Sequence, residues 1–174
     1  MADGRTGSVR WFTPDPRAVI PLDGFRVARS LRQTIRKGKF SVRINTCFEE
    51  VMRHCASRDD TWISEEIIRS YVELHRRGCA HSVEAWSGPS CAGGLYGVAL
   101  GGAFFGESMY SLDRDASKVA LVALVERLRE RRFTLLDVQF MTPHLARFGA
   151  VELSRRTYLE RLSKALATEA AFGD

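Results

Sequence analysis

The sequence predicts a layered α/β (α+β) domain in which helices flank a mixed β-sheet. Three strand-like runs at 81–86, 91–99 and 103–110 follow one another with short turns between them, which is typical of an antiparallel meander. Segments with apolar residues at helical spacing stand before and after these runs, and one more strand-like run follows them. The 174 residues, of which 45% are apolar and 27% charged, are enough for one buried core.

The helices are predicted from the residues that start and stop them. Ser, Thr and Asp accept hydrogen bonds from the free amides of a first helical turn, and Gly adopts the left-handed backbone that ends many helices. In chain order we expect helices at 27–37, 46–56, 64–78, 116–131, 143–149 and 154–166, with caps at Thr46, Ser64, Asp115, Thr142 and Ser154 and stops at Gly38, Gly78 and Gly149.

The strands are predicted from alternating or β-branched runs between turn residues. Besides the meander, residues 40–44 alternate as a short strand, and residues 134–140 form an apolar run after the longest helix. Pro14-Asp15-Pro16 marks a turn at the start of the folded part.

Six glycines lie within the meander. They are Gly93, Gly94, Gly97, Gly101, Gly102 and Gly106. They match neither the G-x-x-x-x-G-K-[ST] nor the G-x-G-x-x-G pattern of phosphate-binding loops. Glycine within a strand indicates either a close approach of ligand to backbone or tight packing, and the sequence leaves both open.

A single domain is expected at 11–168, between a flexible tail at 1–10 and a frayed, Ala-rich end at 169–174. No apolar run approaches the roughly 20 residues that cross a bilayer, and the first residues lack the apolar region of a signal peptide. We therefore expect a cytoplasmic protein without a membrane partner.

The four cysteines, Cys47, Cys55, Cys79 and Cys91, are irregularly spaced and contain no C-x-x-C pair. Reduced thiols are expected, and no metal site is predicted. The histidines stand apart from any nucleophile signature, so the sequence does not support a Ser-His-Asp or Cys-His hydrolase.

Positive charge is concentrated near the amino terminus. The net charge is +5, and residues 1–45 hold ten Arg or Lys against three Asp. Arg29, Arg32 and Arg36 recur at helical spacing, with apolar residues on the opposite stripe. Such a stripe either binds RNA phosphates, with salt-dependent affinity, or is a solvated helix face.

Two polar residues interrupt the apolar run at 134–140. Asp137 and Gln139 stand two apart, which in a strand places both on one face with the apolar side chains on the other. A buried carboxylate needs a hydrogen-bond partner, so a structural network is one interpretation. In the other interpretation the pair orients an attacking amine and helps to remove its proton.

Glu107 and Trp62 are two further candidates. Glu107 lies in an apolar strand, where it either holds a cationic substrate group or pairs with an arginine at the edge of the core. Trp62 precedes the cap at Ser64, where a large aromatic side chain either fills the core or lines a pocket.

Short motifs in a fixed order resemble the leucyl/phenylalanyl-tRNA–protein transferases. They cover about residues 11–160 and are WFTPDPRAVI at 11–20, TWI at 61–63, HSVE at 81–84, GGLYGV at 93–98, GESM at 106–109, ASK at 116–118, LDVQ at 136–139 and FGA at 148–150. Each motif alone is weak, but their ordered sum is specific to this family.

The resemblance implies a GNAT-like acyltransferase domain that moves Leu or Phe from aminoacyl-tRNA onto the N-terminal Lys or Arg of acceptor proteins, which tags them for degradation. Aminoacyl-tRNA is the implied donor, no separate cofactor is implied, and DNA is not an expected partner. The family's amino-terminal domain, with its Gly-Gly-Asp-Leu and Phe-Pro-Trp motifs, is not found in these 174 residues.

The same resemblance implies roles for individual residues. Asp137 and Gln139 match the catalytic pair, in which Gln139 engages the acceptor amine and Asp137 orients Gln139 or steadies the transition state. The implied aminoacyl pocket consists of Trp62, Leu95, Phe104 and Glu107. The stripe of Arg29, Arg32 and Arg36 is consistent with tRNA contact.

Two other functions stay open on the residues alone. One is a tRNA-binding module without catalysis. The other is a small-molecule N-acyltransferase that uses acyl-CoA, although the Q/R-x-x-G-x-G/A pyrophosphate loop typical of that class is missing before the helix at 116–131.

Overall fold

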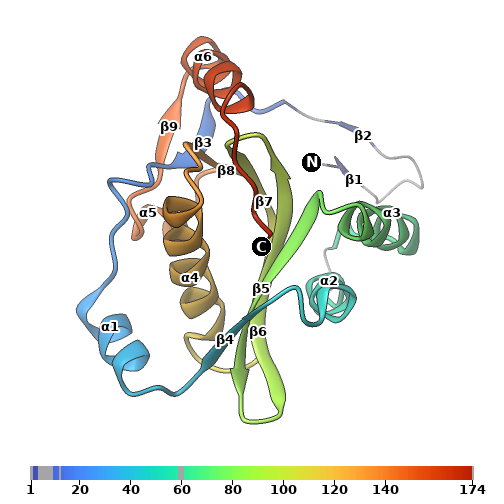
Figure 1. Cartoon of the computed structure of the whole chain (residues 1–174), viewed down its shortest axis with the longest axis vertical. Coiled ribbons are helices and arrows are strands. Elements are labelled where there is room, and N and C mark those ends of the chain that lie inside the picture. The colour runs from blue at the N-terminus through green and yellow to red at the C-terminus, as the bar shows by residue number, and fades with distance from the viewer. Residues whose placement is uncertain (1, 4–9, 12, 59–60, 174) are drawn as a thin grey trace.

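A seven-stranded mixed sheet forms the centre of the protein (Figure 1). The computed structural model describes residues 2–3, 10–11, 13–58 and 61–173. From edge to edge, the strands are β4 (Ser41–Ile44), β5 (Ala80–Ser87), β6 (Ser90–Leu100), β7 (Ala103–Ser111), β8 (Leu135–Gln139), β3 (Arg17–Ile20) and β9 (Val151–Leu153). A separate antiparallel pair is formed by β1 (Ala2–Asp3) and β2 (Arg10–Trp11). Most of the flexible tail predicted at 1–10 lies outside the described residues.

The predicted meander is confirmed, because β5, β6 and β7 pair antiparallel in sequence order. β8 pairs with β7 in parallel, which makes the sheet mixed, as predicted. Two strands of the seven-stranded sheet, β3 and β9, were not predicted, and neither was the separate pair of β1 with β2. Both β3 and β9 are short, and β3 lies between β8 and β9, so their pairing depends on partners far away in sequence.

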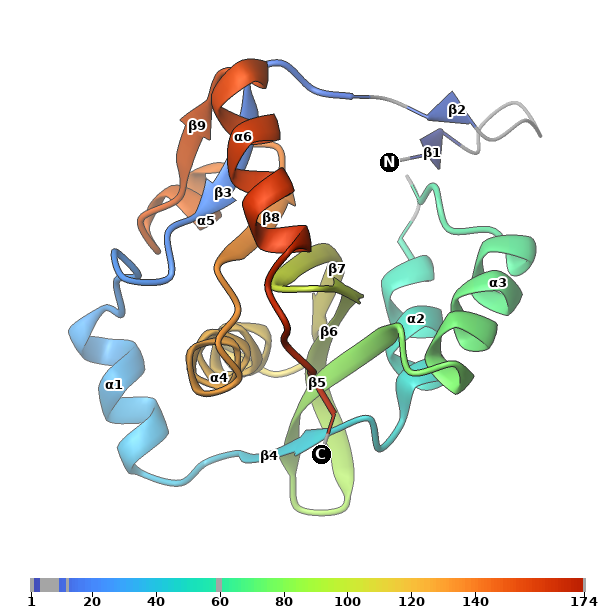
Figure 2. The same ribbon diagram turned by 45° about the horizontal axis from the view of Figure 1, so that its top comes forward.

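Helices cover both faces of the sheet. They are α1 (Arg29–Arg36), α2 (Phe48–Ala56), α3 (Glu65–Arg76), α4 (Ala116–Glu130), α5 (Pro143–Ala146) and α6 (Arg155–Leu166). Figure 2 shows α4 on one side of the central strands and α2 with α3 on the other. The apolar face of α4 builds the main core with Leu95 and Leu136, and α2 and α3 build a second core around Tyr96. No helix in the described part of the chain is both long and apolar enough to cross a membrane.

Three of the predicted helix caps are confirmed: Ser64, Thr142 and Ser154 each accept a hydrogen bond from the backbone N–H three residues later. The caps predicted at Thr46 and Asp115 are wrong, because neither side chain accepts such a bond. Asp115 instead contacts Lys118 at 2.6 Å between carboxylate and ammonium.

The start of α2 is capped from a distance by Glu84 of β5. This side chain is fully buried and accepts hydrogen bonds from the backbone N–H groups of Thr46 at 3.1 Å and Cys47 at 3.3 Å. The Ser82 hydroxyl donates to the same carboxylate at 2.6 Å. An acidic group at a helix N-terminus is stabilised by the free amides and by the helix dipole. Glu84 therefore fixes α2 to the sheet.

Most glycines of the meander permit tight packing. A β-carbon at Gly93 would lie 2.7 Å from that of Ala116, and one at Gly97 would lie 2.3 Å from the carbonyl oxygen of Phe105. At Gly106, in contrast, the nearest atom would be 3.5 Å away. Tight packing therefore explains the crowded glycines, whereas a side chain at Gly106 would make only an ordinary contact.

The carboxyl end is docked, which corrects the frayed end expected at 169–174. Phe172 is 2% exposed and stacks on His81 with 4.4 Å between ring centroids. It also contacts the ring of Phe104, and Arg127 Nε donates to the Phe172 carbonyl oxygen at 2.8 Å. Burial of a Phe side chain is worth about 1.5–3 kcal/mol, enough to hold a short chain end in place.

Candidate active site

A cavity lies where the pairing of β7 with β8 ends. The two strands pair only as far as Phe105 and Asp137. Beyond that point, residues 106–112 and 138–140 line a cavity of about 810 Å³, together with side chains of α4. This volume is within the roughly 300–1,000 Å³ of small-ligand pockets. Parallel strands that part in this way leave room for a substrate between them.

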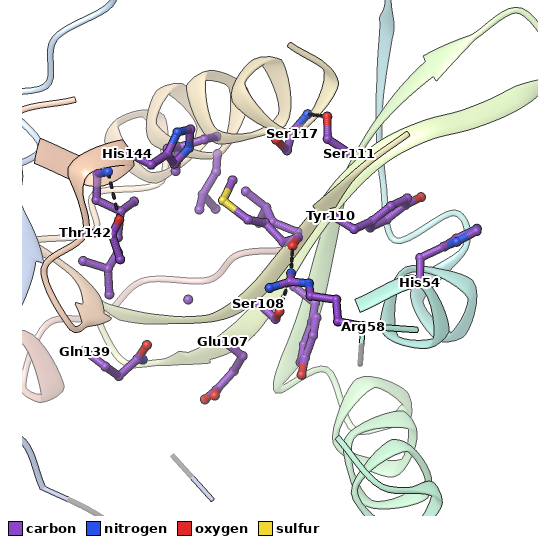
Figure 3. Close-up of a pocket in the computed structure, with 18 of the residues that line it drawn as sticks. His54, Arg58, Glu107, Ser108, Tyr110, Ser111, Ser117, Gln139, Thr142 and His144 are labelled. Carbon is purple, nitrogen blue, oxygen red and sulfur yellow. Dashed lines mark hydrogen bonds between the residues drawn. The ribbon is translucent and has the colours of Figure 1, made fainter. Parts of the chain in front are cut away.

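Gln139 and Glu107 lie at the same end of the cavity (Figure 3). Gln139 ends β8 with a φ of +59°, a left-handed backbone that costs a residue other than glycine about 1–3 kcal/mol. Gln139 lines the cavity with its two neighbours, whereas Asp137 does not. The positive φ at Gln139 marks the end of the regular strand. That Asp137 and Gln139 share one face of β8 stays a prediction.

The Asp137 carboxylate is fully buried and accepts hydrogen bonds from three parts of the chain. Arg17 of β3 donates from Nε to Oδ1 at 3.1 Å and from Nη2 to Oδ2 at 2.7 Å. Tyr158 of α6 donates its hydroxyl to Oδ2 at 2.6 Å, and the backbone N–H of Gln139 donates to Oδ1 at 2.9 Å. Burial and the hydrogen bond to Asp137 raise the pKa of Tyr158, so its hydroxyl stays protonated as a donor.

Arg17 and Tyr158 were not among the predicted site residues. One signal was present, since a buried carboxylate needs a donor and Arg17 stands directly before an apolar run. The pairing itself was not readable, because Arg17 and Asp137 are 120 residues apart. Tyr158 carries no distinguishing signal in the sequence.

Glu107 is a partly buried carboxylate on the cavity wall. Burial raises its pKa, and the negative charge of Asp137 adds to the rise, while the Tyr71 hydroxyl and Arg17 oppose it. A carboxylate with a raised pKa is a stronger base than a free one, and it can hold an ammonium group and accept a proton from it.

Leu95 and Trp62 line the cavity, at the positions that the resemblance implies. Phe104 does not, and its expected place in the pocket wall is corrected. Phe104 has no exposed surface and packs in the main core, with its ring centroid 5.2 Å from that of Phe172. The docked chain end covers the position, so Phe104 supports the core beneath the cavity.

Polar and aromatic side chains that the sequence reasoning did not single out stand on the α2 side of the cavity (Figure 3). His54 stacks on Tyr110 with 4.6 Å between ring centroids. Arg58 donates from Nη2 to the Ser108 hydroxyl at 3.3 Å and to the Met109 carbonyl oxygen. Together they add a cation and a stacked ring pair to a wall that is otherwise apolar.

The basic stripe lies on the exposed face of α1. Arg29, Arg32 and Arg36 are exposed, while Leu31 on the opposite side is 4% exposed. In the segment after α1, Lys39 Nζ lies 3.5 Å from a carboxylate oxygen of Asp113, just before α4. The segment that follows the stripe therefore lies near the end of α4 that contributes Ser117 to the cavity.

Comparison with known proteins gives one consistent answer. The sequence model of the family "Leucyl/phenylalanyl-tRNA protein transferase" matches residues 19–163. The leucyl/phenylalanyl-tRNA–protein transferase of Rubrobacter xylanophilus is 59% identical over 170 residues, which are 97% of this chain and 89% of that protein. That of Herpetosiphon aurantiacus is 58% identical over 167 residues, 95% of this chain and 87% of that protein.

Among solved structures, L-PGS from Bacillus licheniformis superposes on 92% of this chain and 67% of its own, with a TM-score of 0.51 and 10% identity. At that identity the likeness concerns the fold alone, and it agrees with the predicted GNAT-like architecture. The family match, in contrast, extends over most of the sequence at high identity. The chain therefore belongs to the leucyl/phenylalanyl-tRNA–protein transferase family.

Proposed function

We propose that this chain transfers Leu or Phe from aminoacyl-tRNA to the N-terminal Lys or Arg of acceptor proteins in the cytoplasm, and that it does so in the cavity between β7 and β8. The family acts in the N-end rule pathway with an aminoacyl-tRNA donor, a protein acceptor and no separate cofactor, and this chain has that aminoacyltransferase activity. The observation that supports the location is the shared position of Gln139 and Glu107 at one end of a largely apolar cavity.

The transfer reaction requires a deprotonated acceptor amine and a fixed direction for its attack on the aminoacyl ester. The acceptor's α-nitrogen bonds to the aminoacyl carbonyl carbon and the ester C–O bond breaks. The nitrogen gives up a further proton, and the ribose oxygen of the tRNA gains one and leaves as a hydroxyl. An α-ammonium has a pKa of about 7.7–8.0 and must first lose a proton. In our proposal the Glu107 carboxylate holds the ammonium and takes that proton, and the Gln139 side-chain carbonyl orients the amine.

The donor's side chain is proposed to occupy the apolar part of the cavity. Its walls there include Leu95, Leu121, Leu124 and Leu136, with Trp62 nearby on the wall. An apolar pocket separates substrates by size, at about 1–3 kcal/mol for each methylene group. This supports a preference for Leu and Phe over smaller or charged residues.

The tRNA body is proposed to bind along Arg29, Arg32 and Arg36 of α1. Each phosphate contact that is lost lowers the slope of log affinity against log salt by about 0.7–0.9. Changing all three residues to Gln should therefore flatten the salt dependence. The matched control changes Arg69 and Arg76 of α3 and Arg77, which follows it, because all three are also exposed.

The deciding experiment measures transfer of radiolabelled Leu or Phe from purified charged tRNA to peptides that begin with Arg, Lys or Ala. We expect label on the Arg and Lys peptides only. Gln139→Ala and Glu107→Gln should each lower kcat about 100-fold or more, the lower end of what a positioned acid–base group contributes. Absence of transfer by the wild type, despite salt-sensitive tRNA binding, would contradict the proposed reaction. Unchanged kcat in both variants would contradict the proposed site.

A further inference from the structure

The Asp137 carboxylate has no acceptor position left for a substrate proton. A carboxylate offers about four lone-pair sites. Here Arg17 Nε and Nη2, the Tyr158 hydroxyl and the Gln139 backbone N–H occupy them, at 2.6–3.1 Å. A further proton could bind only if one of these bonds were given up.

Asp137 is also separated from the place where substrate would lie. It is fully buried and does not line the cavity, whereas Gln139 does. A hydrogen bond joins Asp137 to the backbone N–H of Gln139 on the cavity wall, and the Asp137 charge also acts on Glu107. That bond holds the residue with the left-handed backbone, and so it fixes where the Gln139 side chain starts.

The surrounding charges favour a fixed anion. The Arg17 side chain is 13% exposed. It donates hydrogen bonds to the Asp137 carboxylate from Nε and Nη2, in the geometry that arginine favours with carboxylates. Its guanidinium also lies over the Tyr158 ring, with Cζ 4.9 Å from the ring centroid. β3, α6 and β8 are thereby joined at one buried charge, and none of the three groups can move without disturbing the others.

We propose that Arg17 and Tyr158 are positioning residues for the transfer reaction, which hold Asp137 as a fixed anion behind Gln139. Asp137 then acts through the Gln139 backbone and does not take the proton of the acceptor amine. This inference rests on the proposed function. It adds Arg17 and Tyr158 to the role that the family resemblance already implies for Asp137, the orientation of Gln139.

Two variants that remove charge at this site test the positioning roles. Asp137→Asn keeps an oxygen that can accept from the Gln139 N–H, but it leaves the Arg17 cation without its partner. Arg17→Gln/Asp137→Asn removes both charges and restores a neutral hydrogen-bonded pair. If Asp137 is a positioning residue, the single variant should lower kcat about tenfold or more, and the double variant should recover about half of that loss or more on a logarithmic scale. KM for tRNA and for peptide should stay within about twofold, because neither residue lines the cavity.

Opposite results follow if Asp137 takes the proton. No second substitution can then replace the lost base, so the double variant would stay at the level of the single one. An Asp137→Asn variant as active as the wild type would also overturn the inference, because the charge would then have no positioning effect. Wild type without any transfer would contradict the proposed function itself, whereas an active wild type with an unrecovered double variant contradicts only the positioning role.

Tyr158→Phe provides an independent variant should Asp137→Asn fail to fold, as judged by circular dichroism. It keeps the ring against Arg17 and removes one donor to the carboxylate. We expect kcat to fall about threefold to tenfold with both KM values unchanged, as for the loss of one charge-assisted bond. Unchanged kcat would overturn the role of Tyr158. Arg161→Gln, an exposed change on the same helix, is the matched control and should leave kcat unaltered.

Discussion

Acidification should destabilise this protein through one buried histidine, His81. Asn45 Oδ1 accepts from the Ser82 backbone N–H at 3.1 Å, so the Asn45 side-chain nitrogen is the donor toward His81 Nδ1, at 3.1 Å. His81 Nε2 then carries the hydrogen and donates to the Gly78 carbonyl oxygen at 3.1 Å. The imidazole is therefore held neutral, and a proton on Nδ1 would break the bond from Asn45.

Burial lowers the pKa of His81 to about 4, from an ordinary value of about 6.5. Each pKa unit corresponds to about 1.4 kcal/mol, so protonation of His81 is about 3 kcal/mol less favourable in the folded chain than in the unfolded chain. The unfolded chain binds this proton more readily, so the contribution is complete above about pH 6.5 and is lost as the pH falls through about 4.

The assay is urea denaturation of the wild type and of His81→Gln between pH 7 and pH 4. The variant should be less stable at pH 7, because it loses the ring contact with Phe172. Its free energy of unfolding should then fall by about 3 kcal/mol less than that of the wild type on acidification. Parallel pH curves for the wild type and His81→Gln would refute the reasoning.

Three further changes test the packing and the cavity. Phe172→Ala should lower the free energy of unfolding by about 3–5 kcal/mol in urea, and a loss below about 1 kcal/mol would mean that the chain end is not docked. Glu84→Gln should cost about 1–3 kcal/mol by the same assay, because α2 loses its buried cap, whereas exposed Glu126→Gln should cost almost nothing. Leu95→Ala enlarges the cavity and should shift the ratio of kcat/KM toward Phe over Leu donors by about tenfold, and an unchanged ratio would place the donor's side chain elsewhere.

Much of the candidate site was predictable because the relevant residues break a local pattern. Glu107 and Gln139 are polar residues in apolar strands, and both line the cavity. Trp62, for which the sequence left core and pocket open, and Leu95, implied by the resemblance, also line it. Phe104 was implied by the same resemblance and lies between two motifs, yet the docked chain end covers it. A motif therefore marked the neighbourhood of each residue but not the direction of its side chain.

The sequence by itself determined the local elements of this protein. Caps such as Ser64 and stops such as Gly78 act through backbone groups a few residues away, so the helix between them follows from neighbouring residues alone. Alternation and turn residues likewise determined the meander, because both act between adjacent segments.

Only the tertiary structure decided which distant segments meet. Three features depend on how the sheet is assembled. They are the parallel pairing of β7 with β8, the cap that Glu84 gives to α2, and the ion pair of Arg17 with Asp137, 120 residues away. The two-residue periodicity of a strand predicts which face a side chain occupies. It does not predict what covers that face or where the strand bends. Gln139 shows the limit, since its positive φ and the hydrogen bond from its N–H to Asp137 belong to a network that joins segments far apart in the sequence.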